Sequence, residues 1–232
     1  MLQPLSTAEI EAILLSLKVS GLGLIVSLPL AVFAAYALAR WRFIGHSLLD
    51  AVIHMPLVLP PVVTGFTLLI LFGRRGPIGS FLYEQFGITL AFRWTGAAVV
   101  AGVMAFPLIV RTVRLAFEAV DPKLEQAAET LGAPRIVTFF VVTLPLAAPG
   151  IVGGAMLGFA KAMGEFGATI TFASNIPGQT RTMSLAIYTF TQSPDGDLAA
   201  LRLSIAAAVI AFAAVIASEF VSRRLNRRVG GA

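Results

Sequence analysis

Long apolar runs without charged residues dominate the pattern along the chain. Crossing the roughly 30 Å hydrocarbon core of a bilayer takes about 20 helical residues, and five runs reach or approach that length. We expect membrane spans at about 12–39, 50–73, 94–117, 136–164 and 198–221. The weakly apolar stretch 166–194 is broken by Pro177 and Arg181, so we expect an outer loop there, with room for a re-entrant turn. The pattern predicts an all-α integral membrane protein with about five transmembrane helices.

A signal peptide would also explain the first apolar run, but the residues before it argue against one. Glu9 and Glu11 precede the run, whereas a signal peptide carries positive charge there and has a shorter apolar core. We therefore expect a retained helix, and a single transmembrane domain over residues 1–232.

Prolines and a glycine repeat mark two of the predicted spans. Residues 55–65 have the sequence Met-Pro-Leu-Val-Leu-Pro-Pro-Val-Val-Thr-Gly, and each proline removes a backbone donor and bends a helix. Two interpretations stay open: a kinked helix packed within a bundle, or broken backbone that lines a transport pathway. In the fourth span, glycines at every fourth position form one face that lets another helix approach closely: Gly150, Gly154 and Gly158.

The composition supports a membrane protein and excludes several kinds of catalytic or metal site. Of the 232 residues 57% are apolar and only 12% are charged, whereas soluble domains have about 25% charged residues. There is no cysteine, which excludes a disulfide scaffold, a thiolate metal site and a cysteine nucleophile. His46 and His54 are too few and too badly spaced for a zinc centre, so we expect no metal site.

The net charge of +5 does not indicate nucleic-acid binding, because the basic residues gather at the edges of apolar runs. Ten Lys and Arg residues fall on the side that contains the loop before the fourth span, and four fall on the opposite side. The larger group comprises Arg40, Arg42, Arg111, Arg114, Lys123, Arg135, Arg223, Arg224, Arg227 and Arg228. The positive-inside rule therefore predicts that this side is cytoplasmic, with the N-terminus outside and the C-terminus inside.

The chain contains no P-loop, since none of its three lysines follows a glycine, and it has no catalytic constellation of residues. We therefore expect that it is not an enzyme and binds no cofactor itself. A chain of intramembrane carboxylates is also missing. The exception is Lys161 and Glu165, four residues apart on one helix face near the outer end of the fourth span. An interfacial ion pair and a position in a transport pathway are both open for this pair.

The loop before the fourth span predicts a short helix within 121–134. Asp121 suits the N-cap and Pro122 the first turn, while Gly132 can end the helix in the left-handed conformation. One apolar stripe follows from the helical spacing of Leu124, Ala127, Ala128 and Leu131. Such a helix has nothing to bury against in its own loop, which indicates docking into a groove of a partner. A helix lying on the membrane surface is the alternative.

This loop resembles the signature of ABC-importer permeases: Glu-Ala-Ala, three residues, Gly, nine residues, then Ile-x-Leu-Pro. Ala127, Ala128, Gly132, Leu144 and Pro145 match that signature at the right spacing. Val142 replaces the usual Ile, and Gln126 stands at the Glu position, with Glu125 one residue earlier. Two further segments, 50–65 and 162–182, are similar to the permease subunits of molybdate importers. Sulfate and tungstate importers share parts of these motifs.

The resemblance implies the type I ABC-importer permease fold and a homodimer around one pathway in the inner membrane of a bacterium. It also implies two partner ATPases, which hold ATP and Mg²⁺, and a periplasmic or lipid-anchored protein that delivers the oxyanion. It assigns ATPase coupling to Leu124, Glu125, Gln126, Ala127, Ala128, Leu131, Gly132, Leu144 and Pro145. For the translocation pathway we expect Thr64, Gly65, Lys161 and Glu165.

The function that we expect is import of molybdate, with tungstate or sulfate as the alternative substrate. A secondary transporter or channel that works alone is a further alternative, but it would normally need buried ionisable residues or an internal repeat. A polytopic membrane enzyme would need a catalytic constellation. A structural membrane protein would leave the docking loop unexplained.

Overall fold

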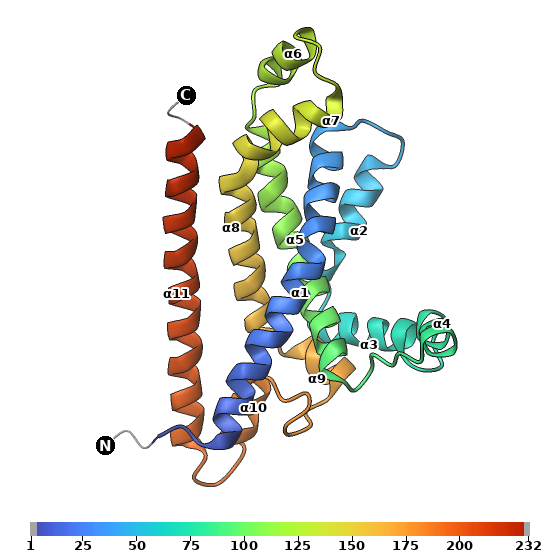
Figure 1. Cartoon of the computed structure of the whole chain (residues 1–232). Helices are drawn as coiled ribbons and strands as arrows, with labels where there is room; N and C mark the ends of the chain where they lie inside the picture. Colours follow the sequence, from blue (N-terminus) through green and yellow to red (C-terminus); the bar gives the residue numbers. More distant parts are fainter. Residues whose placement is uncertain (1–3, 230–232) are drawn as a thin grey trace.

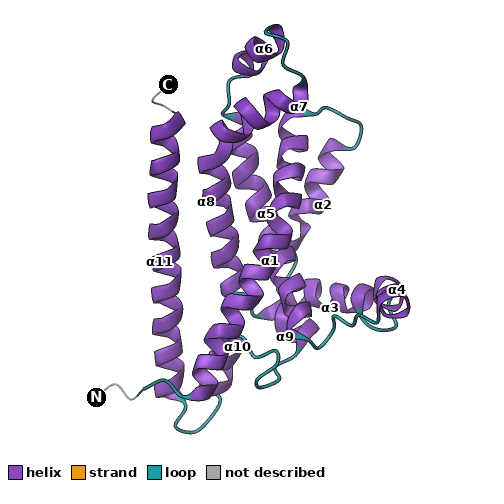
Figure 2. Ribbon diagram, in the orientation of Figure 1, coloured by secondary structure: helices purple, strands orange, loops and turns teal. Residues whose placement is uncertain are grey.

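The computed structural model describes residues 4–229 of the chain, and these residues form helices joined by turns and loops, with no strand among them (Figure 2). The helices are α1 (Thr7–Arg40), α2 (His46–Val58), α3 (Pro61–Phe72), α4 (Pro77–Phe86), α5 (Trp94–Glu118), α6 (Pro122–Thr130), α7 (Arg135–Thr138), the π-helix η1 (Phe139–Thr143), α8 (Leu144–Met163), α9 (Gly167–Ala173), α10 (Met183–Thr191) and α11 (Asp197–Val229). The expected all-α fold is confirmed.

Four of the described helical segments are long and apolar enough to cross a membrane: Thr7–Arg40, Trp94–Glu118, Arg135–Met163 and Asp197–Arg224. The third of these joins α7, η1 and α8. A fifth span exists if the bent pair of α2 and α3 counts as one. The expectation of about five spans agrees with this range.

The segment 50–73, expected as one span, is divided into α2 and α3, whose axes differ by 115°. Leu59 and Pro60 are extended, and α3 restarts with Pro61 in its first turn. Proline has no N–H and disfavours helical geometry in the residue before it, so two consecutive prolines end α2. Because of the bend, α3 and α4 project sideways from the bundle instead of running along it (Figure 1).

At the centre of the bundle, α5 packs between α1 and α8, and α11 packs against α8 (Figure 1). The glycines predicted to allow close approach do so: a Cβ at Gly154 would lie 3.0 Å from Val113 Cγ2, and one at Gly158 would lie 2.5 Å from Ile109 Cγ1. The fourth-position repeat therefore faces α5.

The two ends of the bundle differ in the elements that they carry. One end holds α6 together with the C-terminal ends of α1 and α11, and the other holds α9, α10 and the start of α1 (Figure 1). At the second end, Glu9 is fully buried and accepts two hydrogen bonds from the Arg202 guanidinium, at 2.8 and 3.1 Å. This pair ties the first helix to the last.

Candidate functional site

Helix α6 forms for the local reasons that the sequence indicated. The Asp121 carboxylate caps it by accepting a hydrogen bond from the Lys123 N–H at 2.9 Å, and Pro122 begins it. The helix ends at Thr130, earlier than the predicted segment 121–134, because Leu131 leaves the helix and Gly132 has a left-handed φ of 89°.

The apolar stripe predicted for the α6 segment is largely exposed. Leu124 is 48% exposed, Leu131 is 90% exposed, and Ala127 is also exposed, while Ala128 is half-buried. No residue of α6 is buried. The neighbouring Gln126 is exposed as well. The helix therefore offers an apolar surface that the described part of the chain leaves uncovered.

The remaining residues of the signature lie apart from α6. Leu144 and Pro145 begin α8, directly after the π-helix η1, and they are half-buried and exposed respectively. A π-helical turn carries one extra residue within an α-helix and is often found at functional sites. The signature therefore spans two elements, the exposed helix and the start of the span that follows it.

Beneath α6, two polar residues that the sequence patterns did not single out contact Glu125. Arg40 Nη2 at the end of α1 donates to Glu125 Oε1 at 3.2 Å, and the Thr143 hydroxyl of η1 donates to the same oxygen at 2.7 Å. Arg40 Nη2 also donates to the Val120 carbonyl oxygen at 3.0 Å. A polar cavity of about 300 Å³ lies beside these groups, between α6 and the bundle.

At the opposite end, Lys161 and Glu165 form the ion pair that their spacing allows. Lys161 Nζ lies 2.8 Å from Glu165 Oε2, and the side chains are 30% and 2% exposed. Glu165 Oε1 accepts a second hydrogen bond, from the Ala168 N–H at 3.0 Å. Glu165 thus joins the end of α8 to the first turn of α9.

Thr64 and Gly65 lie on α3, which packs against α9. Thr64 is 6% exposed. A Cβ at Gly65 would lie 2.6 Å from the Ala168 carbonyl oxygen, so only glycine allows this approach. The structure therefore connects three of the four expected pathway residues through α9: Gly65 lies against Ala168, the Ala168 N–H donates to Glu165, and Glu165 pairs with Lys161. Thr64 is the buried neighbour of Gly65 on α3.

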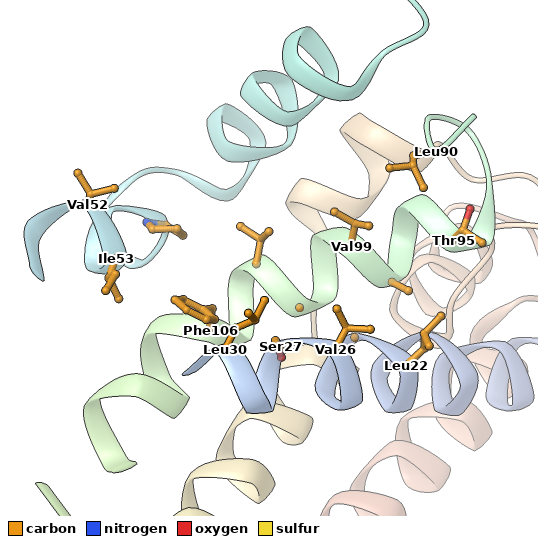
Figure 3. Close-up of a pocket in the computed structure, with 15 residues that line it drawn as sticks. Leu22, Val26, Ser27, Leu30, Val52, Ile53, Leu90, Thr95, Val99 and Phe106 are labelled. Carbon is orange, nitrogen blue, oxygen red and sulfur yellow. The ribbon is translucent and has the colours of Figure 1, made fainter. Parts of the chain in front are cut away.

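A separate apolar cavity of about 570 Å³ lies between α1, α2 and α5 (Figure 3). None of the expected pathway residues lines it. Its walls include Leu22, Val26, Ile53, Val99 and Phe106. Ser27 and Thr95 are the only lining residues with polar side chains, so a charged oxyanion would lose its hydration there for few hydrogen bonds, and the cavity suits an apolar occupant.

Comparison with known proteins relates these features to a family. Residues 27–231 match the family described as binding-protein-dependent transport system inner membrane component. The chain is 55% identical over 226 residues to the molybdenum transport system permease protein ModB of Escherichia coli (strain K12), covering 97% of this chain and 99% of that one. The ModB protein of Haemophilus influenzae is 50% identical over 96% of this chain and 97% of its own length.

Similarity to a sulfate permease and to a solved structure is lower. The sulfate transport system permease protein CysT of Salmonella typhimurium is 39% identical over 199 residues, covering 85% of this chain and 70% of that one. The crystal structure of a bacterial alginate ABC transporter in complex with an alginate pentasaccharide-bound periplasmic protein has a TM-score of 0.75 at 20% identity. The match covers 96% of this chain and 81% of that chain, and it concerns the fold alone.

Proposed function

Because the chain belongs to the family of binding-protein-dependent transport system inner membrane components, we propose that it is the membrane-spanning permease of an ATP-driven importer of molybdate. The observation that supports molybdate as the substrate is the 55% identity, over nearly the full length of both chains, to a molybdenum permease. The sulfate permease is more distant at 39%. The fold of the alginate transporter agrees with the importer-permease fold that the loop signature implied.

The partners follow from this proposal. Two copies of the chain enclose one pathway, and each presents α6 to an ATPase subunit that holds ATP and Mg²⁺. The exposed apolar side chains of Leu124 on α6 and of Leu131 directly after it support this docking, because a stripe of that kind fits a groove. A periplasmic or lipid-anchored binding protein delivers the oxyanion, in keeping with the periplasmic protein bound to the alginate transporter.

The orientation in the proposal places the α6 end of the bundle in the cytoplasm. The charge count that predicts this orientation agrees with the fold in one respect. Arg40 ends α1, Arg135 begins α7, and Arg114 lies one turn before the end of α5. These helix ends lie at the end of the bundle that carries α6 (Figure 1). The N-terminus is then outside and the C-terminus inside the bacterial inner membrane.

Transport in this scheme is a two-state equilibrium that ligands bias. ATP binding closes the ATPases and draws the two α6 helices together, the spans open outward, and hydrolysis resets them. The permease supplies the two conformations, while the other subunits supply energy and capture of substrate.

The pathway in the proposal passes the corner where α3, α8 and α9 meet, at Thr64, Gly65, Lys161 and Glu165. The ammonium group of Lys161 attracts a dianion, and the carboxylate of Glu165 opposes it. Their 2.8 Å pair is neutral overall, which favours weak binding and easy release over tight capture.

Reconstitution tests the proposal directly. The chain, its ATPase and its binding protein are placed in liposomes, and uptake of molybdate is measured with and without ATP, against excess sulfate and against tungstate. We expect uptake that needs ATP and resists sulfate. Uptake without ATP would indicate a secondary transporter. ATP-driven uptake that excess sulfate abolishes would indicate that sulfate, and not molybdate, is the preferred substrate.

A further inference from the structure

Helix α6 has little apolar packing against the bundle, since Ala128 is its only half-buried apolar residue. None of its residues is buried; Leu124 on the helix and Leu131, directly after its end, are both exposed. A polar cavity of about 300 Å³ separates part of it from the bundle. Apart from the chain connections at its two ends, α6 is therefore held chiefly by a small number of polar contacts with the bundle.

Glu125 makes the strongest of these contacts. One carboxylate oxygen accepts from Arg40 of α1 at 3.2 Å and from Thr143 of η1 at 2.7 Å. The Arg40 and Glu125 side chains are only 16% and 19% exposed. Charge-assisted hydrogen bonds are strong, and partial exclusion of water strengthens them further. A single carboxylate thus joins three elements.

The other polar contact between α6 and the rest of the described chain is longer and more exposed to solvent. Glu129, one turn after Glu125, lies 3.7 Å from Arg135, and these side chains are 42% and 91% exposed. An exposed pair at that distance contributes little, because solvent screens it. Glu129 therefore has the same charge on the same helix but lacks the fastening contacts, which makes it a matched control.

We propose that Glu125 is a positioning residue that fastens the docking helix α6 to α1 and to the π-helical turn η1, so that a displacement of α6 moves both. The inference rests on the proposed function, because it is the ATPase that displaces α6. Helix α8 follows η1 directly and ends at the Lys161–Glu165 pair, so the contact of Thr143 with Glu125 connects the docking helix to the candidate pathway through one continuous helix.

The fastening itself is tested without any partner protein. Amide hydrogen exchange of residues 123–130 is measured on the purified full chain in lipid nanodiscs. We expect Glu125→Gln and Arg40→Met each to speed exchange about tenfold, the effect of losing a hydrogen bond to a charged group, while Glu129→Gln leaves it unchanged. Equal exchange in all four chains would overturn the proposal.

The transmission of movement is tested in the reconstituted complex, as molybdate taken up per ATP hydrolysed. We expect Glu125→Gln and Arg40→Met to lower this ratio about tenfold while hydrolysis continues, and the double variant to be no worse than either single one. Glu129→Gln should match the wild type.

Two results in the complex would contradict the proposal. If Glu125→Gln lowered copurification of the ATPase while Arg40→Met did not, Glu125 would contact the partner and not the bundle. If uptake per ATP were unchanged in both variants, the contacts would not transmit movement. Absence of ATP-dependent uptake in the wild type would refute the proposed function instead. The hydrogen-exchange measurement would still test whether Glu125 holds α6 against the bundle.

Discussion

The short helices α6 and α9 are similar in length, with nine and seven residues, but they lie in opposite surroundings. In α9, Ala168, Phe172 and Ala173 are completely buried, whereas α6 buries nothing. Helix α9 is held by packing beneath α3, and α6 is held by the polar contacts of one carboxylate. This difference fits the proposed roles, in which α9 is a packed part of the bundle and α6 is the surface that a partner displaces.

Truncation of the α9 core should give the largest effect on folding. Phe172 is fully buried among α5 and α3 side chains, so Phe172→Ala should lower the free energy of unfolding by about 3–5 kcal/mol, the usual loss for a buried phenylalanine. Thermal unfolding of the purified chain in detergent measures it. Leu131→Ala on α6 is the comparison variant, and a similar loss there would remove the distinction between the two helices.

Crowding the contact between α3 and α9 should come next. Gly65→Ala would place a Cβ against the Ala168 backbone, so we expect a loss of about 1–3 kcal/mol from overpacking. Gly153→Ala in α8 is the control, because nothing lies within 4 Å of a Cβ there. The same thermal unfolding measurement applies, and equal stability of the two variants would show that α3 moves aside freely.

Removing the charge that faces Glu165 should have a smaller effect. Lys161→Met leaves the carboxylate 2% exposed without its cation, but Lys161 itself is partly exposed, so we expect a loss of about 1–2 kcal/mol. The double variant Lys161→Met/Glu165→Gln should recover part of it, since an amide needs no counter-charge. Molybdate uptake of Lys161→Met tests the pathway separately: unchanged uptake would remove Lys161 from it.

The smallest effect on stability should accompany a loss of function. Leu131→Asp changes a side chain that is 90% exposed, so the free energy of unfolding should shift by less than about 0.5 kcal/mol. Because the variant places a charge in the apolar stripe, copurification of the ATPase and ATP-dependent uptake should both fall. Thr130→Asp adds the same charge to exposed Thr130 outside the stripe and should leave both unchanged; equal losses would refute docking through the stripe.

Helix α6 was predictable because its signals are local. Asp121, Pro122 and Gly132 fix its start and end within a dozen residues, and the docking prediction rested on the same segment. The contact of Glu125 with Arg40 was not predictable, because the two residues are 85 positions apart and no periodic pattern connects them. The sequence indicates Arg40 only as one of the basic residues on the side predicted to be cytoplasmic.

The surroundings of α9 and the break before α3 were less predictable, because they depend on residues far apart in the chain. The prolines between 56 and 61 left both a kinked helix and broken backbone open for the second span, and they did not give the size of the bend. The 115° bend lets Gly65 pack on Ala168, which lies about a hundred residues later in the chain. The four pathway candidates were chosen separately, as a Thr-Gly pair beside prolines and as an isolated ion pair. Only the folded chain shows that α9 links them.

The buried pair of Glu9 and Arg202 has a consequence for how the chain is made. Its members are 193 residues apart, so on the ribosome the first helix emerges long before its counter-charge exists. A fully buried carboxylate without a partner is costly. The start of α1 can therefore reach this paired arrangement only after α11, which carries Arg202, has been made.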